Sequence, residues 1–310
     1  MPAVPEADGR NFLDPKVLTR IARLEVRART VVEGFVSGLH RSPYHGLSVE
    51  FASHREYVPG DETKHIDWKV WARADRLYVK QYEEETNLRA TLLVDASRSM
   101  RYGGADGGMS KFTYACTVAA SLAYLLHLQQ DAVGLVTFDT AVRRSLPPSS
   151  HPSHLKLLLH ELAGTEPDNR TDVAEVFHRL AEEITRRGLV VLVSDLLLDL
   201  GSLTRALQHF RHKRHEVVVF QVLHEDELVF PFQDNTMFRG LEVEQQILTE
   251  PRALRKAYLE ALDGFLGRVR RTCADLGIDY MLMSTHDPLD AALASYLAFR
   301  RRKARAVLKR

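Results

Sequence analysis

The chain has 310 residues, of which 45% are hydrophobic and 27% are charged, and its formal net charge is +1. This composition is ordinary for a globular protein, and the length is sufficient for a substantial core. A net charge so close to zero argues against wholesale binding of nucleic acid or another polyanion. Any electrostatic function must therefore be local.

Targeting signals and cysteines indicate the compartment. No charged-then-apolar signal segment opens the chain, and no apolar run approaches the about 18 residues that a membrane-spanning helix requires. Cys116 and Cys273 both fall on apolar faces of helical patterns, so we expect them to pack as small hydrophobic side chains rather than to form a disulfide. These features predict a cytoplasmic protein without a membrane span.

Residues 1–37 are predicted to form a polar lead-in and a helix. Asp14 followed by Pro15 has the pattern of a cap with proline in the first helical position, and apolar residues then recur at helical spacing. Four arginines fall largely on the other faces of this helix: Arg20, Arg23, Arg27 and Arg29. We interpret them as a solvated basic face, because acidic residues balance the charge of the chain.

Residues 38–90 form a segment of different composition. Glycine, proline, histidine and aromatic residues increase, and long helical periodicity disappears, which indicates short strands and ordered loops. Pro59 and Gly60 have the pattern of a turn. Arginines and carboxylates are dense near Trp68 and Trp71, and we interpret them as ion pairs that fix an irregular segment rather than as a functional site.

The next stretch carries the functional prediction. Residues 91–94 are β-branched or aliphatic without polar alternation, as in a strand buried on both faces of a parallel sheet. A D-x-S-x-S pattern follows at once, formed by Asp95, Ser97 and Ser99. Ligands of open α/β sheets bind outside the carboxyl ends of strands, so these side chains are expected at the mouth of a crevice. Their oxygens suit Mg²⁺ or Mn²⁺ rather than zinc.

The rest of the chain alternates helical and buried-strand patterns. Helices are predicted at 111–130, 154–162, 172–187, 202–213 and 251–276, and strands at 133–138, 142–146, 189–194, 216–223 and 278–283. Repeated β-α-β units predict an α/β fold with a six-stranded, mostly parallel sheet and helices on both faces. A polar excursion at 224–250 interrupts the alternation, and residues 235–248 within it have the pattern of a small hairpin.

Two later residues extend the D-x-S-x-S pattern. Thr171 stands just before a helical pattern, and Asp195 ends the predicted strand 189–194. The ordered set resembles the von Willebrand factor A family, in which a metal-ion-dependent adhesion site is made from D-x-S-x-S, a loop threonine and a later strand-end aspartate. The matching residues are Asp95, Ser97, Ser99, Thr171 and Asp195. The alternative is that they are helix caps and turn residues without a metal.

The segment upstream makes a more specific resemblance. The pattern ahead of the Asp-Ala-Ser-Arg-Ser-Met site consists of Gly46, Phe51, Arg55, Tyr57, Pro59-Gly60-Asp61, Ile66-Asp67-Trp68 and Ala72-Arg73. It resembles an uncharacterised bacterial family, filed as a domain of unknown function, whose members are similar to von Willebrand A domains and typically accompany MoxR-type AAA+ ATPases. The resemblance covers roughly residues 38–290 and implies a doubly wound von Willebrand A-like domain at 91–290. Relatives often carry a transmembrane hairpin ahead of this region, and no such pattern is seen here.

The resemblance implies a binding module rather than an enzyme. Asp95 and Asp195 roughly neutralise a Mg²⁺ or Mn²⁺ ion and leave its octahedron open to water or to an acidic residue of a protein ligand. By resemblance the partner is a MoxR-type AAA+ ATPase, and the pair acts in maturation or remodelling of other proteins. Residues 291–310 form a basic tail, which we interpret as a solvated helix end; docking on an acidic partner or anionic lipid is the alternative.

Two other functions stay open. In the first, Asp95 is the nucleophile of a Mg²⁺-dependent phosphatase or phosphotransferase. Such an enzyme is expected to place a second acid close to its nucleophile, whereas the nearby positions are Ser97 and Ser99. In the second, the domain is a scaffold that binds no metal.

Overall fold

The computed structural model describes residues 15–41, 54–56, 71, 77–80, 88–104, 107–169, 173–242 and 244–290. The chain divides into two compact units, one formed by residues 38–87 and the other by residues 1–37 and 88–310. In the smaller unit, the short strands β1 (His54–Glu56) and β2 (Tyr78–Lys80) pair in antiparallel fashion. Most residues of the upstream family pattern, and the basic tail at 291–310, lie outside the described residues.

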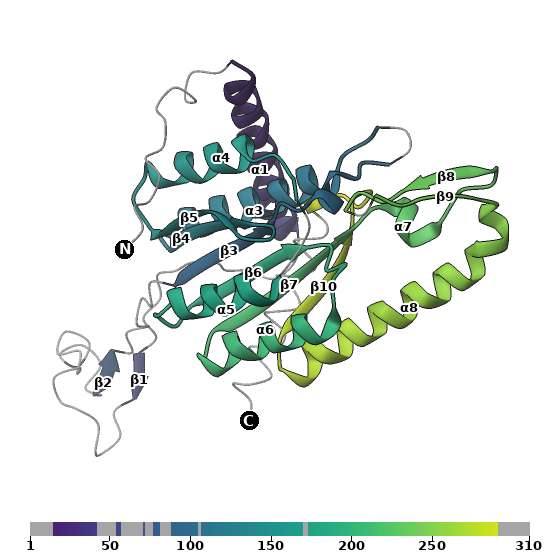
Figure 1. Cartoon of the computed structure of the whole chain (residues 1–310). Helices are drawn as coiled ribbons and strands as arrows, with labels where there is room; N and C mark the ends of the chain where they lie inside the picture. The colour runs from purple at the N-terminus through teal and green to yellow at the C-terminus, as the bar shows by residue number, and fades with distance from the viewer. Residues whose placement is uncertain are drawn as a thin grey trace, which may run out of the picture. The chain divides into compact units, whose positions relative to one another are not determined.

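The larger unit is built on a six-stranded sheet (Figure 1). In spatial order its strands are β10 (Asp279–Ser284), β7 (Glu216–Leu223), β6 (Leu189–Ser194), β3 (Arg89–Asp95), β4 (Ala132–Phe138) and β5 (Val142–Ser149). Neighbouring strands run parallel, except that β5 is antiparallel to β4 at one edge. The prediction of an α/β fold with a mostly parallel six-stranded sheet is therefore confirmed.

The inner strands are mostly apolar because helices cover both faces of the sheet. Every residue of β4 and β6 is buried. Strand β5 was predicted to stop at residue 146, before Pro147 and Pro148, but it continues to Ser149. Proline is tolerated there because β5 is an edge strand with register irregularities, where a missing N–H group costs little.

Two groups of helices enclose separate cores on the two faces of the sheet. On one face lie α1 (Pro15–Arg41), α3 (Lys111–Leu128) and α4 (His154–Gly164). On the other lie α5 (Val173–Glu183), α6 (Leu200–His212) and α8 (Pro251–Asp275) (Figure 1). Each core contains one buried, unpaired cysteine, Cys116 or Cys273, as the apolar periodicity predicted. None of the described helices combines the length and apolarity that spanning a membrane requires.

The strand order reverses at β3. From β3 the chain proceeds outward to β4 and β5, and it then returns to β6 on the other side of β3. The connections that leave β3 and β6 therefore diverge, and the side chains at these two strand ends lie at a topological switch point, where open α/β sheets bind ligands. The short 3₁₀ helix η3 (Arg98–Arg101) begins directly after the end of β3.

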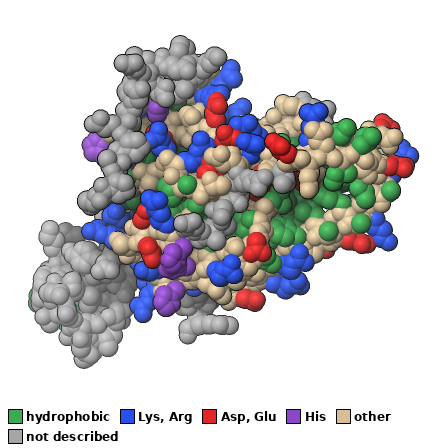
Figure 2. Space-filling model, viewed as in Figure 1, with side chains coloured by type: hydrophobic (Ala, Val, Ile, Leu, Met, Phe, Trp, Pro, Cys, Tyr) green, Lys and Arg blue, Asp and Glu red, His purple; other side chains and the backbone are tan. Residues whose placement is uncertain are grey.

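The polar excursion contains a short helix and a hairpin. Helix α7 (Glu225–Val229) is followed by β8 (Thr236–Arg239) and β9 (Gln246–Thr249), whose antiparallel pairing confirms the predicted hairpin. Figure 2 shows hydrophobic side chains gathered on the surface over the hairpin and α8. Those with large exposed fractions are Met237, Leu241, Ile247, Leu248 and Leu254. This concentration of apolar surface makes the excursion a candidate contact region.

The central strand should dominate stability. Leu92 of β3 has no exposed surface, so we predict that Leu92→Ala lowers the free energy of unfolding by about 2–5 kcal/mol through lost burial and a residual cavity. The matched control is Leu248→Ala on the hairpin, where the side chain is 67% exposed and the expected change is within about 0.5 kcal/mol. Equilibrium unfolding in urea measures both, and similar losses in the two variants would contradict the assignment of the core.

Candidate functional site

Asp95 is the last residue of β3, and it has no exposed surface. One carboxylate oxygen, Oδ1, accepts the backbone N–H of Ser97 at 2.9 Å, which turns the chain out of the strand. The other, Oδ2, accepts the hydroxyl of Ser194, the last residue of β6, at 2.5 Å. Both oxygens of Asp95 are therefore held by donors, and the two central strand ends are joined through this carboxylate.

The two serines of the D-x-S-x-S pattern lie together beside Asp95. The hydroxyl oxygens of Ser97 and Ser99 are 3.1 Å apart, and Ser97 is fully buried. Arg98, between them, is directed to a different partner, because its guanidinium pairs with Asp168 at 2.9 Å. The backbone N–H of Ser99 donates to Oε1 of Glu242, from the loop between β8 and β9, at 3.3 Å. The structure thus gathers the first three predicted residues.

Asp195 follows β6 and is also buried. Its Oδ1 accepts the backbone N–H of Leu197 at 3.1 Å, and its Oδ2 accepts the ammonium of Lys111 at 2.8 Å. Burial and then the negative charge of Asp195 raise the pKa of Asp95 to about 7, although hydrogen bonds from Ser194 and Ser97 act in the opposite direction. The two predicted carboxylates therefore converge closely enough to repel one another.

Thr171 lies outside the described residues, but the loop that leads to it is described. The backbone N–H of Asp168 donates to the carbonyl oxygen of Ala96, and the backbone N–H of Arg98 donates to the carbonyl oxygen of Asn169, both at 2.9 Å. These bonds place the loop after α4 alongside the turn that follows β3. The loop is therefore anchored two residues before the predicted threonine.

Lys111 is a site residue that the sequence analysis missed. It is the first residue of α3, it is 1% exposed, and its ammonium lies 2.8 Å from both Asp195 Oδ2 and Glu227 Oε1. Burial alone lowers the pKa of Lys111, but the two carboxylates more than reverse this effect, so the pKa is raised and the side chain stays charged. A lysine at the positive end of a helix is unfavourable, and this was a sequence signal for nearby acids.

Glu227 connects the site to α7. Its Oε2 accepts the backbone N–H of His224 at 2.7 Å, while His224 Nδ1 accepts the N–H of Asp226 at 3.1 Å, which together form a capping box. Tyr102, just after η3, donates its hydroxyl to Asp226 Oδ2 at 2.8 Å. The start of the polar excursion is therefore bound to both α3 and the loop after β3. The acidic run after His224 was the sequence signal for this short helix.

These four side chains, Asp95, Asp195, Lys111 and Glu227, form what we call the carboxylate cluster. With every group ionised, the cluster has one positive and three negative charges, so two negative charges are not compensated within it. Among the described residues, no three His, Cys, Asp or Glu side chains are arranged as a metal site of that composition. A cation at the cluster would therefore also require hydroxyl or water ligands, and Ser97 and Ser99 supply such hydroxyls.

A cavity of about 560 Å³ opens beside the carboxylate cluster, with Ser99 and Lys111 on one wall. Aromatic side chains from the segment after α7, from β8 and from α8 also line it: Phe230, Phe232, Phe238 and Tyr258. These rings pack on one another, with centroid separations of 4.7 Å between Phe230 and Tyr258 and 5.2 Å between Phe232 and Phe238. The cluster thus borders a space that can hold an apolar side chain.

The fold and this strand-end site define an α/β protein with a candidate ligand site at its switch point. A family model described as "Protein of unknown function DUF58" matches residues 53–263, and the chain belongs to this family. An uncharacterised protein of Mycobacterium tuberculosis is 27% identical over 299 residues, which cover 94% of this chain and 92% of the relative. The resemblance to a bacterial family of unknown function is therefore confirmed.

Solved structures show more distant likenesses of fold. BatB from Bacteroides thetaiotaomicron covers 69% of this chain and 99% of its own, with a TM-score of 0.46 and 15% identity. An aerotolerance-related membrane protein from Bacteroides fragilis covers 68% of this chain and 97% of its own, with a TM-score of 0.45 and 18% identity. This neighbour is described as a membrane protein, and the cytoplasmic location expected from the sequence is withdrawn.

The raised pKa of Asp95 predicts a pH dependence of stability without metal. Between about pH 4 and pH 7 the folded chain holds a proton that the unfolded chain has lost, so stability should fall as the pH rises through this window. Asp95→Asn should remove this decline and be at least as stable as the wild type at pH 8 in chelator. Urea unfolding between pH 5 and 8 measures the free energy of unfolding of both proteins. Asp234→Asn, on the exposed loop before β8, is the control. A large loss of stability in Asp95→Asn at pH 8 would make Asp95 a structural acid.

Lys111 should be essential to the charge balance of the cluster. Lys111→Met leaves Asp195 and Glu227 without a counter-charge, so we predict a loss of about 3–5 kcal/mol in the free energy of unfolding. The double variant Lys111→Met/Asp195→Asn should recover part of the loss, because it also removes one of the two charges. Urea unfolding tests this against Lys156→Met, an exposed lysine on α4. Equal effects of Lys111→Met and Lys156→Met would contradict the ion pairs.

Proposed function

We propose that this protein is a metal-dependent protein-binding module with a von Willebrand A-like fold and an adhesion-type site. Asp95, Ser97, Ser99 and Asp195 would hold Mg²⁺ or Mn²⁺, together with Thr171, which the resemblance supplies. The observation that carries the proposal is the convergence of two buried carboxylates and a pair of hydroxyls at the switch point of the sheet. A divalent cation would neutralise the two negative charges left over in the carboxylate cluster.

The donor set fits a hard cation. Each oxygen of Asp95 and Asp195 accepts a hydrogen bond from the protein, and a carboxylate oxygen has two lone pairs, so an oxygen with a single donor keeps a position for a metal or its water. Hydroxyl and carboxylate oxygens are the ligands that Mg²⁺ takes, and it usually keeps several waters. A bound cation with waters left to exchange supplies attraction for an incoming carboxylate.

The expected partner follows from the resemblance and from the cavity beside the cluster. By resemblance it is a MoxR-type AAA+ ATPase, which would present an Asp or Glu to the metal, and the pair would act in maturation or remodelling of other proteins. The aromatic side chains that line the cavity give a neighbouring apolar side chain of the partner a place to bury. The exposed apolar residues of the hairpin extend this surface.

The geometry favours a binding module over the phosphatase alternative. Asp95 has no exposed surface and both its oxygens accept hydrogen bonds, so it is poorly placed to attack a substrate phosphorus atom. Lys111 favours the metal-free scaffold to some extent, because its ammonium already neutralises part of the charge on Asp195. Direct measurement of metal binding separates these functions.

Loss of a site hydroxyl should weaken metal binding and leave the fold intact. We predict that Ser97→Ala and Ser99→Ala each lower the affinity for Mn²⁺ and Mg²⁺ by about tenfold, with thermal unfolding in chelator nearly unchanged. Isothermal titration calorimetry measures the affinity, and Ser145→Ala on the exposed edge strand β5 is the control. Capture of a purified MoxR-type ATPase should require Mg²⁺, and with Ser99→Ala it should require about tenfold more Mg²⁺.

Three outcomes would contradict the proposal. One is the absence of heat at millimolar Mg²⁺ and Mn²⁺, which favours the metal-free scaffold. Another is ATPase capture that is insensitive to chelator, because the metal would then have no part in binding. The third is Mg²⁺-dependent hydrolysis of an aryl phosphate that Asp95→Asn abolishes, which would establish the enzymatic alternative.

A further inference from the structure

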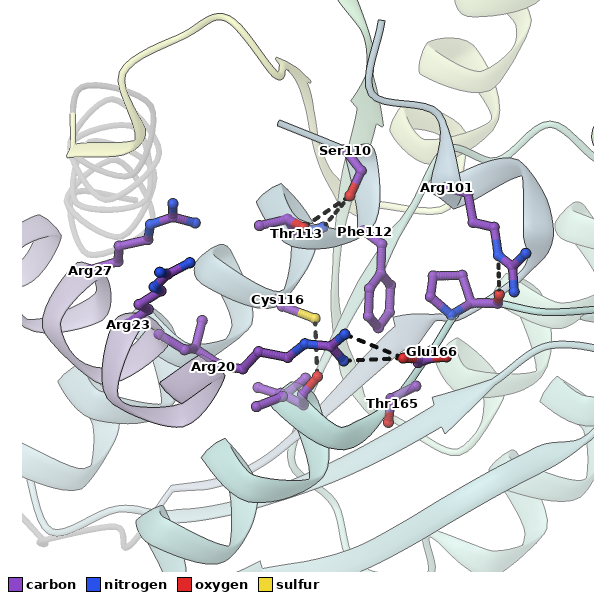
Figure 3. A pocket seen from close by; sticks show the side chains of 14 residues that line it. Arg20, Arg23, Arg27, Arg101, Ser110, Phe112, Thr113, Cys116, Thr165 and Glu166 are labelled. Carbon is purple, nitrogen blue, oxygen red and sulfur yellow. Dashed lines mark hydrogen bonds and ion pairs between the residues drawn. The ribbon is translucent and has the colours of Figure 1, made fainter. Parts of the chain in front are cut away.

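A second cavity, of about 600 Å³, has an arginine-rich wall (Figure 3). It is bounded by α1, the beginning of α3, the end of α4 and the loop that follows α4. Its four cationic side chains are Arg20, Arg23 and Arg27 of α1 and Arg101 of η3. One carboxylate, Glu166, lies among the residues that line it. The cavity wall therefore carries a strong excess of positive charge.

Two of these arginines lack a counter-charge. Arg20 is paired with Glu166 at 3.2 Å, and Arg101 donates to the carbonyl oxygen of Pro167 at 2.5 Å and pairs with Asp168 at 3.8 Å. Within the described part of the chain, Arg23 and Arg27 contact no carboxylate. Both are exposed at the cavity, and Figure 3 shows their side chains on the same side of α1 as the cavity. They are therefore available to an anionic ligand.

The spacing of Arg23 and Arg27 on α1 is unfavourable for the helix alone. Arg23 and Arg27 are four residues apart, and like charges at this spacing disfavour a helix by a few tenths of a kcal/mol. Leu24, between them in sequence, is buried in the core and also lines the cavity, so this edge of the helix faces the protein. Both arginines are exposed, as expected for a solvated basic face, and they also line the cavity. Arg29 is exposed too, but it does not line the cavity and it pairs with Glu25 at 3.9 Å.

The chemistry of the cavity favours a phosphate-bearing ligand. Guanidinium groups match phosphate oxygens through two parallel hydrogen bonds, and a phosphate carries more charge than a single carboxylate. Ser110 and Thr113, at the N-terminal end of α3, add hydroxyl groups to the wall; these hydroxyls are hydrogen-bonded to each other at 2.9 Å, so one of the two can donate to a ligand. The volume exceeds what inorganic phosphate needs and lies in the range of small-molecule sites, and Leu24 and Phe112 offer an apolar surface to an organic group.

We propose that this cavity binds a small organic phosphate, of the class of nucleoside diphosphates, through Arg23 and Arg27, with Arg20 and Arg101 at the same wall. The site is separate from the proposed metal site and does not depend on it. Attraction between several guanidinium groups and the phosphates makes binding sensitive to salt.

The test is calorimetric titration of the full chain with ADP and with pyrophosphate, both in chelator so that no metal can bridge to the carboxylate cluster. Binding should weaken at least tenfold in Arg23→Ala/Arg27→Ala. It should weaken less in Arg23→Lys/Arg27→Lys, which keeps the charge but loses the paired geometry. Arg29→Ala is the matched control on the same helix, and it should bind like the wild type.

Four results would overturn the proposal. They are the absence of binding at millimolar ADP and pyrophosphate, equal losses in the Arg29→Ala and Arg23→Ala/Arg27→Ala variants, and equal affinity for citrate, which would show a general anion site. The fourth is binding only to vesicles that contain phosphatidic acid, which would identify a lipid surface instead of a soluble ligand. Circular dichroism of each variant confirms that α1 has kept its helical structure.

Discussion

The repulsion between two buried carboxylates, Asp95 and Asp195, is the constraint on which the rest of the site depends. Adjacent parallel strands deliver both groups to the same edge of the sheet, where burial makes each charge costly. The protein offsets this cost with hydrogen bonds to every carboxylate oxygen and with the ammonium of Lys111. The compensation is partial, and a partly compensated buried charge is a common basis for binding a cation.

This constraint links distant parts of the chain. Lys111 is bound to both Asp195 and Glu227, so the carboxylate cluster joins the ends of the central strands to α3 and α7. Glu227 also caps α7, the helix from which the chain continues into the apolar hairpin. Ser99 reaches the loop of that hairpin through Glu242. The charges of the site and the apolar surface beside it are therefore parts of one connected structure.

The sequence was most informative where chemistry is local. Buried parallel strands appear as uninterrupted apolar runs, so β6 and β7 were predicted at their observed bounds, and the carboxylates at strand ends followed from the same pattern. Lys111 and Glu227 are 116 residues apart in the sequence, and hydrophobic periodicity does not predict a contact between residues so far apart. The cavity beside Arg23 was missed for a similar reason, because helical spacing separates polar from apolar faces but does not show which polar edge meets a neighbouring element.

The central claim is that a divalent cation binds between the ends of β3 and β6. Anomalous X-ray diffraction from crystals grown with Mn²⁺ tests it most directly, because the anomalous signal locates the ion itself. The account predicts one strong peak within about 2–2.5 Å of carboxylate oxygens of Asp95 and Asp195, or of waters bound to them. The hydroxyls of Ser97 and Ser99 should lie close to the same peak. A map without a peak at saturating Mn²⁺, with the Lys111 ammonium still on Asp195, would contradict it.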